Sequence, residues 1–425
     1  ARVPCVHAAR SGVCAGAGAI IESPNGATML AAGRKVEVTG RGLEGIHLQV
    51  QAPTDQAVNL GQLKGDAVGI FAGTLKHSGL AQATAVSVEG GKVVLKGQAS
   101  AEIAGTTTAQ KGALGGTVHA TANKVMLKSG AIIDASGANG GGEVLVGGGW
   151  QGKDARLANA QQTTAEAGAT INADATQRGN GGTVVLWSDD ATRTRAAISA
   201  RGGVSGGHGG KLETSGKRFL DANVAPQLNA RVAGWLGGDW LLDPYELVVG
   251  PGTPPAESPS TNVYTGTNSG SGSSYVSAAT LVTALNSGSN VTLQTSGGAT
   301  APAPNEVRIR VAESIVKTGG GTASLKLVAH ENVQLDTGVT IGSTSGALNI
   351  ELRSGYSATD TVNSSTGGSV ILAAVMLKLG TYAYLRFSMG LFPGPASSLS
   401  ANLAGIAILG GIIYGALVAW KQQDV

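Results

Sequence analysis

The sequence predicts an all-β fold, a parallel β-helix (solenoid), over residues 18–366. Glycine accounts for 67 of the 425 residues, whereas aromatic residues make up 4% and charged residues 13%. Short runs rich in Val, Ile, Leu and Ala alternate with glycine and small polar residues. This composition favours many short strands joined by tight turns. Glycine reaches backbone conformations that other residues avoid, and β-branched side chains pack well on strands.

An internal repeat indicates how the strands are spaced. A Gly-Gly-x-apolar unit occurs as GGKVVL at Gly90, GGTVHA at Gly115, GGEVLV at Gly141, GGTVVL at Gly181 and GGKLET at Gly209, at spacings of 25, 26, 40 and 28 residues. Strands this short cannot bury a face alone, so they must stack on equivalent strands of neighbouring coils. We expect Val, Ile and Leu to point inward and Thr, Lys, Gln and Ser to point outward.

Changes in composition divide the chain into parts. Pro, Gly, Ser and Thr dominate residues 250–275, and Ala and Leu dominate 276–288, which is typical of a short helix. We expect five segments, in chain order: an atypical start (1–17), a β-helix (18–249), a linker or loop (250–275), a short helix followed by further β-helix coils (276–366), and two transmembrane helices (367–425).

Two apolar runs near the end of the chain predict a membrane hairpin. Residues 369–392 and 399–420 are each close to the ~20 residues that span a bilayer as a helix. Membrane lipid is therefore an expected partner of 369–420. Lys378 lies inside the first run, and an ionisable group at membrane depth is costly and usually functional. Arg386 is expected near an interface.

The charge and the motif content argue against several function classes. The formal net charge is +3 and no basic run concentrates it, so we expect no nucleic-acid partner. The sequence contains no GxGxxG or GxxxxGK[ST] motif, and its six histidines are scattered, so neither a cofactor nor a metal site is predicted. Two cysteines, Cys5 and Cys14, allow a disulfide near the start of the chain.

Three short patterns are interpreted as structural, and no catalytic residue is predicted. Residues 203–207 match the G-x-S-x-G nucleophile pattern, but glycine corners surround them instead of a strand and a helix. Residues 64–66, Lys-Gly-Asp, are expected to form a solvated turn. Trp235, Trp240 and Tyr245 are expected to form a packing plug between solenoid sections.

Five stretches of the first part carry a family resemblance: GAIIESPNGATMLAAGRKVEV, QAPTDQAVNLGQL, GGTVVLWSDDATRTRAAISARGG, WLLDPYELVV and YVSAATLVTALNSGSNVTL. Residues 18–366 resemble the passenger of filamentous-haemagglutinin-type exoproteins, which use two-partner secretion. The resemblance implies a right-handed parallel β-helix, an outer-membrane two-partner-secretion pore as partner, and host or cell-surface ligands. It also implies an extracellular or cell-surface location. We expect the amino-terminal secretion domain, with which proteins of that family engage their pore, to be absent from this chain.

The end of the chain resembles another family. The stretches GGSVILAAVMLKLGTYAYLRFSMGLFPG and GIIYGALVAWKQQDV, within 367–425, are similar to chain M, the antiporter-like subunit of bacterial NADH–quinone oxidoreductase. This resemblance implies an inner-membrane location and a proton-relay role for Lys378. The matching segment lacks the other helices that form the proton path in that family, so we do not expect this chain to work as a proton pump. The two likenesses meet near Thr366, and we interpret the chain as a fusion of two gene fragments, either natural or introduced during sequence assembly.

The expected function is that of a surface-exposed or secreted structural or adhesive β-helix that is fused to a two-helix membrane fragment and is not an enzyme. Two alternatives remain. The C-terminal fragment alone suggests a proton-translocating membrane subunit of NADH–quinone oxidoreductase. A β-helical polysaccharide-processing enzyme would need clustered carboxylates or basic residues on one face of adjacent coils, and the sequence predicts no such cluster.

Overall fold

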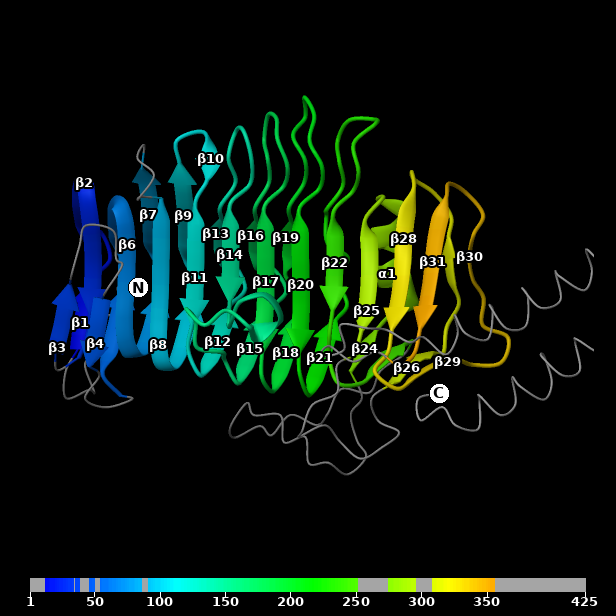
Figure 1. Ribbon diagram of the computed structural model, residues 1–425. Helices are drawn as coiled ribbons and strands as arrows, with labels where there is room; N and C mark the ends of the chain where they lie inside the picture. Colours follow the sequence, from blue (N-terminus) through cyan, green and yellow to red (C-terminus); the bar gives the residue numbers. More distant parts are fainter. Residues whose placement is uncertain are drawn as a thin grey trace, which may run out of the picture. The chain divides into compact units, whose positions relative to one another are not determined.

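A computed structural model describes residues 12–33, 35–38, 46–49, 54–85, 91–250, 274–295 and 308–355. Within these ranges, short strands pair in parallel from coil to coil and form three faces around one apolar core (Figure 1). The predicted parallel solenoid is therefore confirmed. The predicted transmembrane helices, 369–392 and 399–420, lie outside the described ranges. No helix inside them is long and apolar enough to cross a membrane.

The first face contains the strands that follow the Gly-Gly units. Thr117 pairs with Lys92 on one side and with Glu143 on the other, and Thr183 pairs with Glu143 and with Lys211. Each unit thus occupies the same level of its coil, because glycine corners set where the strand begins. The strands of this face are the second half of β2 (Ile20–Ala31), the middle of β6 (Gln62–His77), the first half of β8 (Lys92–Ile103), β11 (Thr117–Thr121), β14 (Glu143–Val146), β17 (Thr183–Ser188), β20 (Lys211–Gly216), β22 (Asp239–Leu242), β25 (Asn290–Gln294), β28 (Ala323–Val328) and β31 (Leu348–Arg353).

Two further faces complete each coil. The second contains β1 (Gly12–Ala15), β5 (Gln56–Asn59), the ends of β6 and β8, β12 (Lys124–Leu127), β15 (Gln162–Ala165), β18 (Ala191–Thr194), β21 (Phe219–Ala222), β23 (Leu247–Val249), β24 (Tyr275–Val276), β26 (Arg308–Val311) and β29 (Asn332–Leu335). The third contains the starts of β2 and β6, β7 (Leu80–Ala85), β9 (Thr106–Lys111), β13 (Ile132–Asp134), β16 (Thr170–Asn172), β19 (Ala197–Ser199), β27 (Ile315–Lys317) and β30 (Ile341–Ser343). Two short antiparallel pairs lie beside them: β10 (Leu114–Gly115) with β9, and β3 (Lys35–Val38) with β4 (Ile46–Gln49).

The core confirms the predicted alternation. Val93, Val118, Val144 and Val184 are aligned by the strand register of four successive coils, and all four are fully buried. Burying a valine side chain stabilises the fold by ~1.5–3 kcal/mol, so a continuous column of them is a large share of the stability. At the start of the array, Cys14 in β1 is disulfide-bonded, as the cysteine content allowed.

One lysine departs from the prediction that lysines point outward. Lys317, at the end of β27, is fully buried. Its Nζ donates hydrogen bonds to the carbonyl oxygens of Gly319 (2.5 Å), Gly320 (3.3 Å) and Ser345 (2.9 Å). An ammonium group has three donors. Burial is tolerated here because backbone carbonyls of two coils satisfy all of them.

The predicted short helix is confirmed as α1 (Ala278–Asn286). Ser277 caps its start, because its Oγ accepts a hydrogen bond from the Thr280 amide at 3.1 Å. Gly288, with φ of 85°, follows its end. The helix lies between second-face β24 and first-face β25, so it takes the place of a third-face strand. It buries Leu281, Ala284 and Leu285 in the common core.

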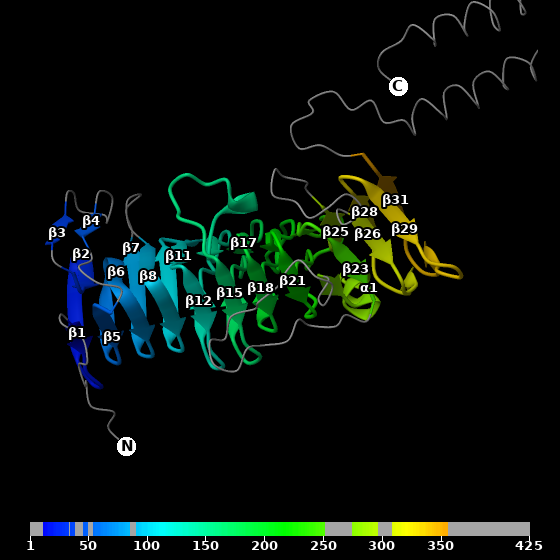
Figure 2. The same cartoon turned by 90° about the horizontal axis from the view of Figure 1, so that it is seen from below.

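An insertion explains the longest spacing in the repeat. Between β14 and β15 the chain leaves the coil at residues 147–161, which include the 3₁₀ helix η1 (Trp150–Gly152). We call these residues the cover loop. In Figure 2 it appears as the blue-green loop that stands out from the row of strands beside β17.

His77 is a buried titratable group at a coil corner. Its Nδ1 lies 3.1 Å from Asn59 Nδ2 and its Nε2 lies 3.2 Å from the carbonyl oxygen of Thr106. This geometry fits a neutral ring that accepts from Asn59 and donates to Thr106. Burial lowers the pKa of His77 to about 4, and the hydrogen bond to the Thr106 carbonyl partly opposes this shift.

We expect His77 to weaken the fold in acid. Because the pKa is depressed in the folded state, unfolding takes up a proton below pH 6.5, and this stabilising contribution is lost as the pH falls towards 4. The free energy of unfolding of the wild type, relative to His77→Gln, should fall by about 3 kcal/mol between pH 7 and pH 4. Urea denaturation at several pH values measures this difference. Parallel curves for the two proteins would contradict it.

Candidate functional site

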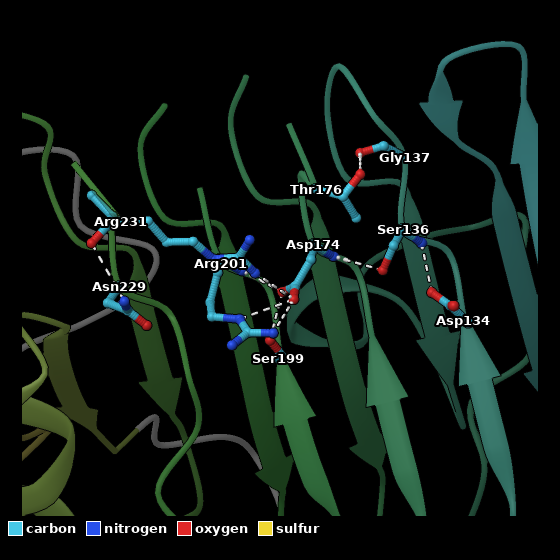
Figure 3. Close-up of polar contacts among 10 residues, drawn as sticks. Asp134, Ser136, Gly137, Asp174, Thr176, Ser199, Arg201, Asn229 and Arg231 are labelled. Carbon is cyan, nitrogen blue, oxygen red and sulfur yellow. Dashed lines mark hydrogen bonds and ion pairs between the residues drawn. The ribbon is translucent and has the colours of Figure 1, made fainter. Parts of the chain in front are cut away.

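A buried aspartate links successive coils along one corner of the solenoid (Figure 3). Asp174, just after β16, is 5% exposed. Its Oδ1 accepts hydrogen bonds from Ser199 Oγ (2.5 Å) and from the Arg201 amide (2.7 Å). Its Oδ2 accepts from Arg201 Nη2 (2.6 Å) and Nε (2.9 Å) and from Arg231 Nη2 (3.0 Å). On the other side, the Asp174 amide donates to Ser136 Oγ at 3.1 Å.

This arrangement is structural in its chemistry. A carboxylate has about four lone-pair sites, and Asp174 already accepts five hydrogen bonds. It therefore has no free position for a nucleophile or a general base. Asp221 forms a similar ion pair with an arginine. Arg195 Nη1 and Nη2 donate hydrogen bonds to its two carboxylate oxygens at 2.7 and 2.6 Å.

These ion-pair clusters correct the expectation that no charged cluster lies on adjacent coils. Asp174 and Arg201 are 27 residues apart, and Asp174 and Arg231 are 57 apart. Only the coil register brings them together. A partial signal existed in the sequence: Asp174, Arg201 and Arg231 each stand shortly before a Gly-Gly pair, at Gly181, Gly209 and Gly237, so superimposing the repeats brings them near one another without aligning them.

A second cluster lies on the outside of the first face, beneath the cover loop. Leu145, Val185 and Trp187 form a small apolar cluster there, which we call the outer patch. Glycines let the loop backbone approach the indole closely. A Cβ added to Gly152 would lie 2.5 Å from Trp187 Nε1, and one added to Gly148 would lie 2.7 Å from Trp187 Cδ1. The cover loop therefore seals the outer patch, and Trp187 is only 2% exposed.

Two carboxyl groups lie beside the outer patch on adjacent coils. Glu213, in β20, is fully buried, and Asp243, just after β22, is 4% exposed. The Gln151 amide donates to Glu213 Oε2 at 2.7 Å, and Gln151 Nε2 donates to Asp243 Oδ2 at 3.4 Å. Gln294 Nε2 also donates to Asp243 Oδ2, at 3.0 Å. Gln151 thus holds the cover loop on both carboxyl groups.

Glu213 is the most perturbed carboxyl group of this cluster. Burial raises the pKa of Glu213 to about 8; hydrogen bonds from Gln151 and Ser215 oppose the shift, and the nearby charge of Asp243 adds to it. Its Oε1 is buried without a hydrogen-bond partner. A carboxyl group of this kind is neutral at pH 7. Pairs of carboxyl groups with separated pKa values occur at catalytic sites, although structural networks also produce them.

A third feature is a row of exposed apolar side chains at the tips of the corner loops. Val204, Trp235 and Leu236 are 51%, 45% and 66% exposed. His208 contacts the Trp235 ring edge to face, with centroids 4.9 Å apart. The expected packing plug is therefore wrong for Trp235. It is confirmed for Trp240, which is buried and donates from Nε1 to Thr214 Oγ1 at 2.9 Å.

The other short patterns can now be placed. Residues 64–66 lie inside strand β6, so the expected solvated turn is wrong. Residues 203–207 form a turn closed by a bridge between Gly203 and Gly206, with no helix after it, as expected from the glycine corners. Lys378 lies outside the described residues, and its role stays a prediction.

Comparison with known proteins finds two separate likenesses. Residues 358–425 match the family described as NADH:quinone oxidoreductase/Mrp antiporter, TM. Over 64 residues, 15% of the chain, the sequence is 42% identical to NADH-quinone oxidoreductase subunit M of Rhodobacter capsulatus. Over the same length it is 41% identical to subunit M of Rickettsia prowazekii and 39% identical to NADH-ubiquinone oxidoreductase chain 4 of Dictyostelium citrinum. The chain spans only 12%, 13% and 15% of the length of these relatives.

The second likeness is to a solved structure. The HMW1 secretion domain from Haemophilus influenzae is 31% identical, with a TM-score of 0.45, and the match covers 53% of this chain and 59% of that domain. A TM-score this low decides neither fold nor export.

The C-terminal segment of this chain is similar to a short piece of NADH–quinone oxidoreductase subunit M. The match begins at residue 358, whereas we expected it to begin at 367.

Proposed function

We propose that this chain is a surface-exposed or secreted structural and adhesive solenoid, and that it is not an enzyme. The exposed loop-tip row of Val204, Trp235 and Leu236 supports the adhesive role most directly. Exposed clusters of large apolar residues are uncommon on soluble proteins and usually mark interaction sites. The haemagglutinin-type resemblance of residues 18–366 supports the same role and an outer-membrane pore as its export partner.

An adhesion assay tests this proposal. Bacteria that display the full chain should adhere to host epithelial cells, and the double variant Trp235→Ser, Leu236→Ser should reduce adherence severalfold. Leu114→Ser, which removes another exposed leucine on β10, is the matched control and should leave adherence unchanged. Equal adherence of the wild type and the double variant would refute the adhesive role of this row.

Polysaccharide processing is the second candidate, and the carboxyl pair Glu213 and Asp243 favours it. Glycosidases use one carboxyl group with a raised pKa as a general acid beside a second, ionised carboxylate. However, both groups lie beneath the cover loop and are nearly inaccessible. We therefore rank it second. Turnover of a polysaccharide by the wild type that Glu213→Gln abolishes would establish this candidate over the adhesive one.

The C-terminal segment should anchor the chain in membranes. The likeness of residues 358–425 to subunit M and the two apolar runs of about 20 residues support a hairpin. We expect the full chain to sediment with membranes and to resist carbonate extraction, and deletion of 369–425 to release it. Lys378→Met should leave this partition intact, because it removes a charge from an apolar run. We propose a proton-relay role for Lys378 only in the parent family. Release of the full chain by carbonate would contradict the hairpin.

A further inference from the structure

The cover loop has three features that a passive insertion would not need. It seals an apolar outer patch, its Gln151 is hydrogen-bonded to two buried carboxyl groups, and that residue is strained. Gln151 has φ of 53°, one of only two non-glycine residues with positive φ in the described ranges. Non-glycine residues pay about 1–3 kcal/mol for such conformations, which persist when surrounding contacts enforce them. Here those contacts are Glu213 and Asp243.

We propose that residues 147–161 act as a cover that mildly alkaline pH releases from the solenoid, exposing Leu145, Val185 and Trp187. In the closed form Glu213 is neutral, and its Oε2 accepts the Gln151 amide hydrogen. Loss of the Glu213 proton places a negative charge beside Asp243 in a site without water access. Opening the loop hydrates that charge.

Burial of Glu213 sets the direction of this response, and the charges that surround it modify it. Asp243 faces it from the next coil and disfavours its ionisation, whereas Lys153 of the cover loop favours it. Lys153 is exposed, and its Nζ bonds to Gln151 Oε1 at 3.0 Å, so its charge is largely screened. Burial is the largest influence on Glu213, and burial ends when the loop opens. Alkaline pH therefore favours the open form.

Release of the cover would change what the solenoid presents to its surroundings. The outer patch contains a tryptophan and two branched aliphatic residues on the flat outside of adjacent strands. Closed, it is sealed by Gly148 and Gly152 against the indole. Open, it would offer an apolar surface to a partner or a dye. This device is independent of the loop-tip row and of the adhesive function.

Hydrogen–deuterium exchange on the full chain tests the proposal, with protection factors corrected for intrinsic exchange at each pH. Between pH 6 and pH 8, protection of peptides covering 147–161 should fall about tenfold per pH unit, because opening exposes a group whose proton is then lost. Glu213→Gln should keep its protection constant. Glu102→Gln, the same change on the outside of β8, should behave as the wild type does. Constant protection in the wild type, or an equal fall in Glu213→Gln, would overturn the proposal.

A second variant holds the cover open without touching a carboxyl group. Gly152→Ala places a methyl group 2.5 Å from Trp187 Nε1, at φ of 63°, and should prevent closure. We expect low protection of 147–161 at every pH and binding of an apolar fluorescent dye already at pH 6. Wild-type protection with an unchanged pH response in Gly152→Ala would count against the proposal, even if Glu213→Gln failed to fold.

Discussion

Replacing Asp174 with Asn should lower the free energy of unfolding by about 3–5 kcal/mol. The neutral amide cannot balance the guanidinium groups of Arg201 and Arg231, and removing one partner of a buried ion pair leaves uncompensated charge. Because Asp174 joins neighbouring coils, the loss should reduce cooperativity along the array. Urea denaturation followed by circular dichroism measures the shift.

Asp154→Asn is the matched control for this prediction. Asp154 also forms a close pair with an arginine, Arg156, at 2.6 Å, but the arginine side chain is 69% exposed. Exposed ion pairs contribute about 0–1 kcal/mol, so this variant should unfold nearly as the wild type does. Equal destabilisation by the two substitutions would show that burial does not distinguish these ion pairs.

The second large effect is a loss of stability as pH rises through neutrality, caused by Glu213. Its pKa is raised from 4.5 to about 8 in the folded state, so unfolding releases a proton anywhere between these values. This contribution is complete below pH 4.5 and is lost at about 1.4 kcal/mol per pH unit until pH 8. Between pH 6.5 and pH 8 the wild type should therefore lose about 2 kcal/mol relative to Glu213→Gln.

This pH window separates Glu213 from the other perturbed groups. His77 acts between pH 6.5 and pH 4, so it contributes nothing above 6.5. Burial also raises the pKa of Asp190, but that group is present in both proteins and cancels in the difference. Denaturation of both proteins at pH 6.5, 7 and 8 gives the comparison. A difference that does not change with pH would mean that Glu213 is already ionised at neutral pH.

Much of the solenoid could be predicted, because each element is encoded by neighbouring residues. Gly-Gly corners before apolar runs marked the first-face strands, and an Ala- and Leu-rich stretch marked α1. The sequence pattern alone gave wrong predictions for residues whose position depends on contacts with residues far away in the sequence. Lysines were expected to point outward, yet Lys317 is buried, and its Nζ donates hydrogen bonds to carbonyl oxygens of two coils. Residues 64–66 were expected to form a turn, yet they lie in β6, where Lys64 and Gly65 pair with strands of both neighbouring coils.

The sequence by itself determined that the chain stacks glycine-cornered strands in parallel coils, and that its end is similar to a membrane subunit. Only the tertiary structure revealed which charged groups meet. Asp174 meets Arg201 and Arg231, and Glu213 meets Asp243, across coils of unequal length. An insertion such as the cover loop changes the spacing without changing the strand register. Contacts between coils therefore follow the backbone hydrogen bonds between strands, and distance along the sequence does not predict them.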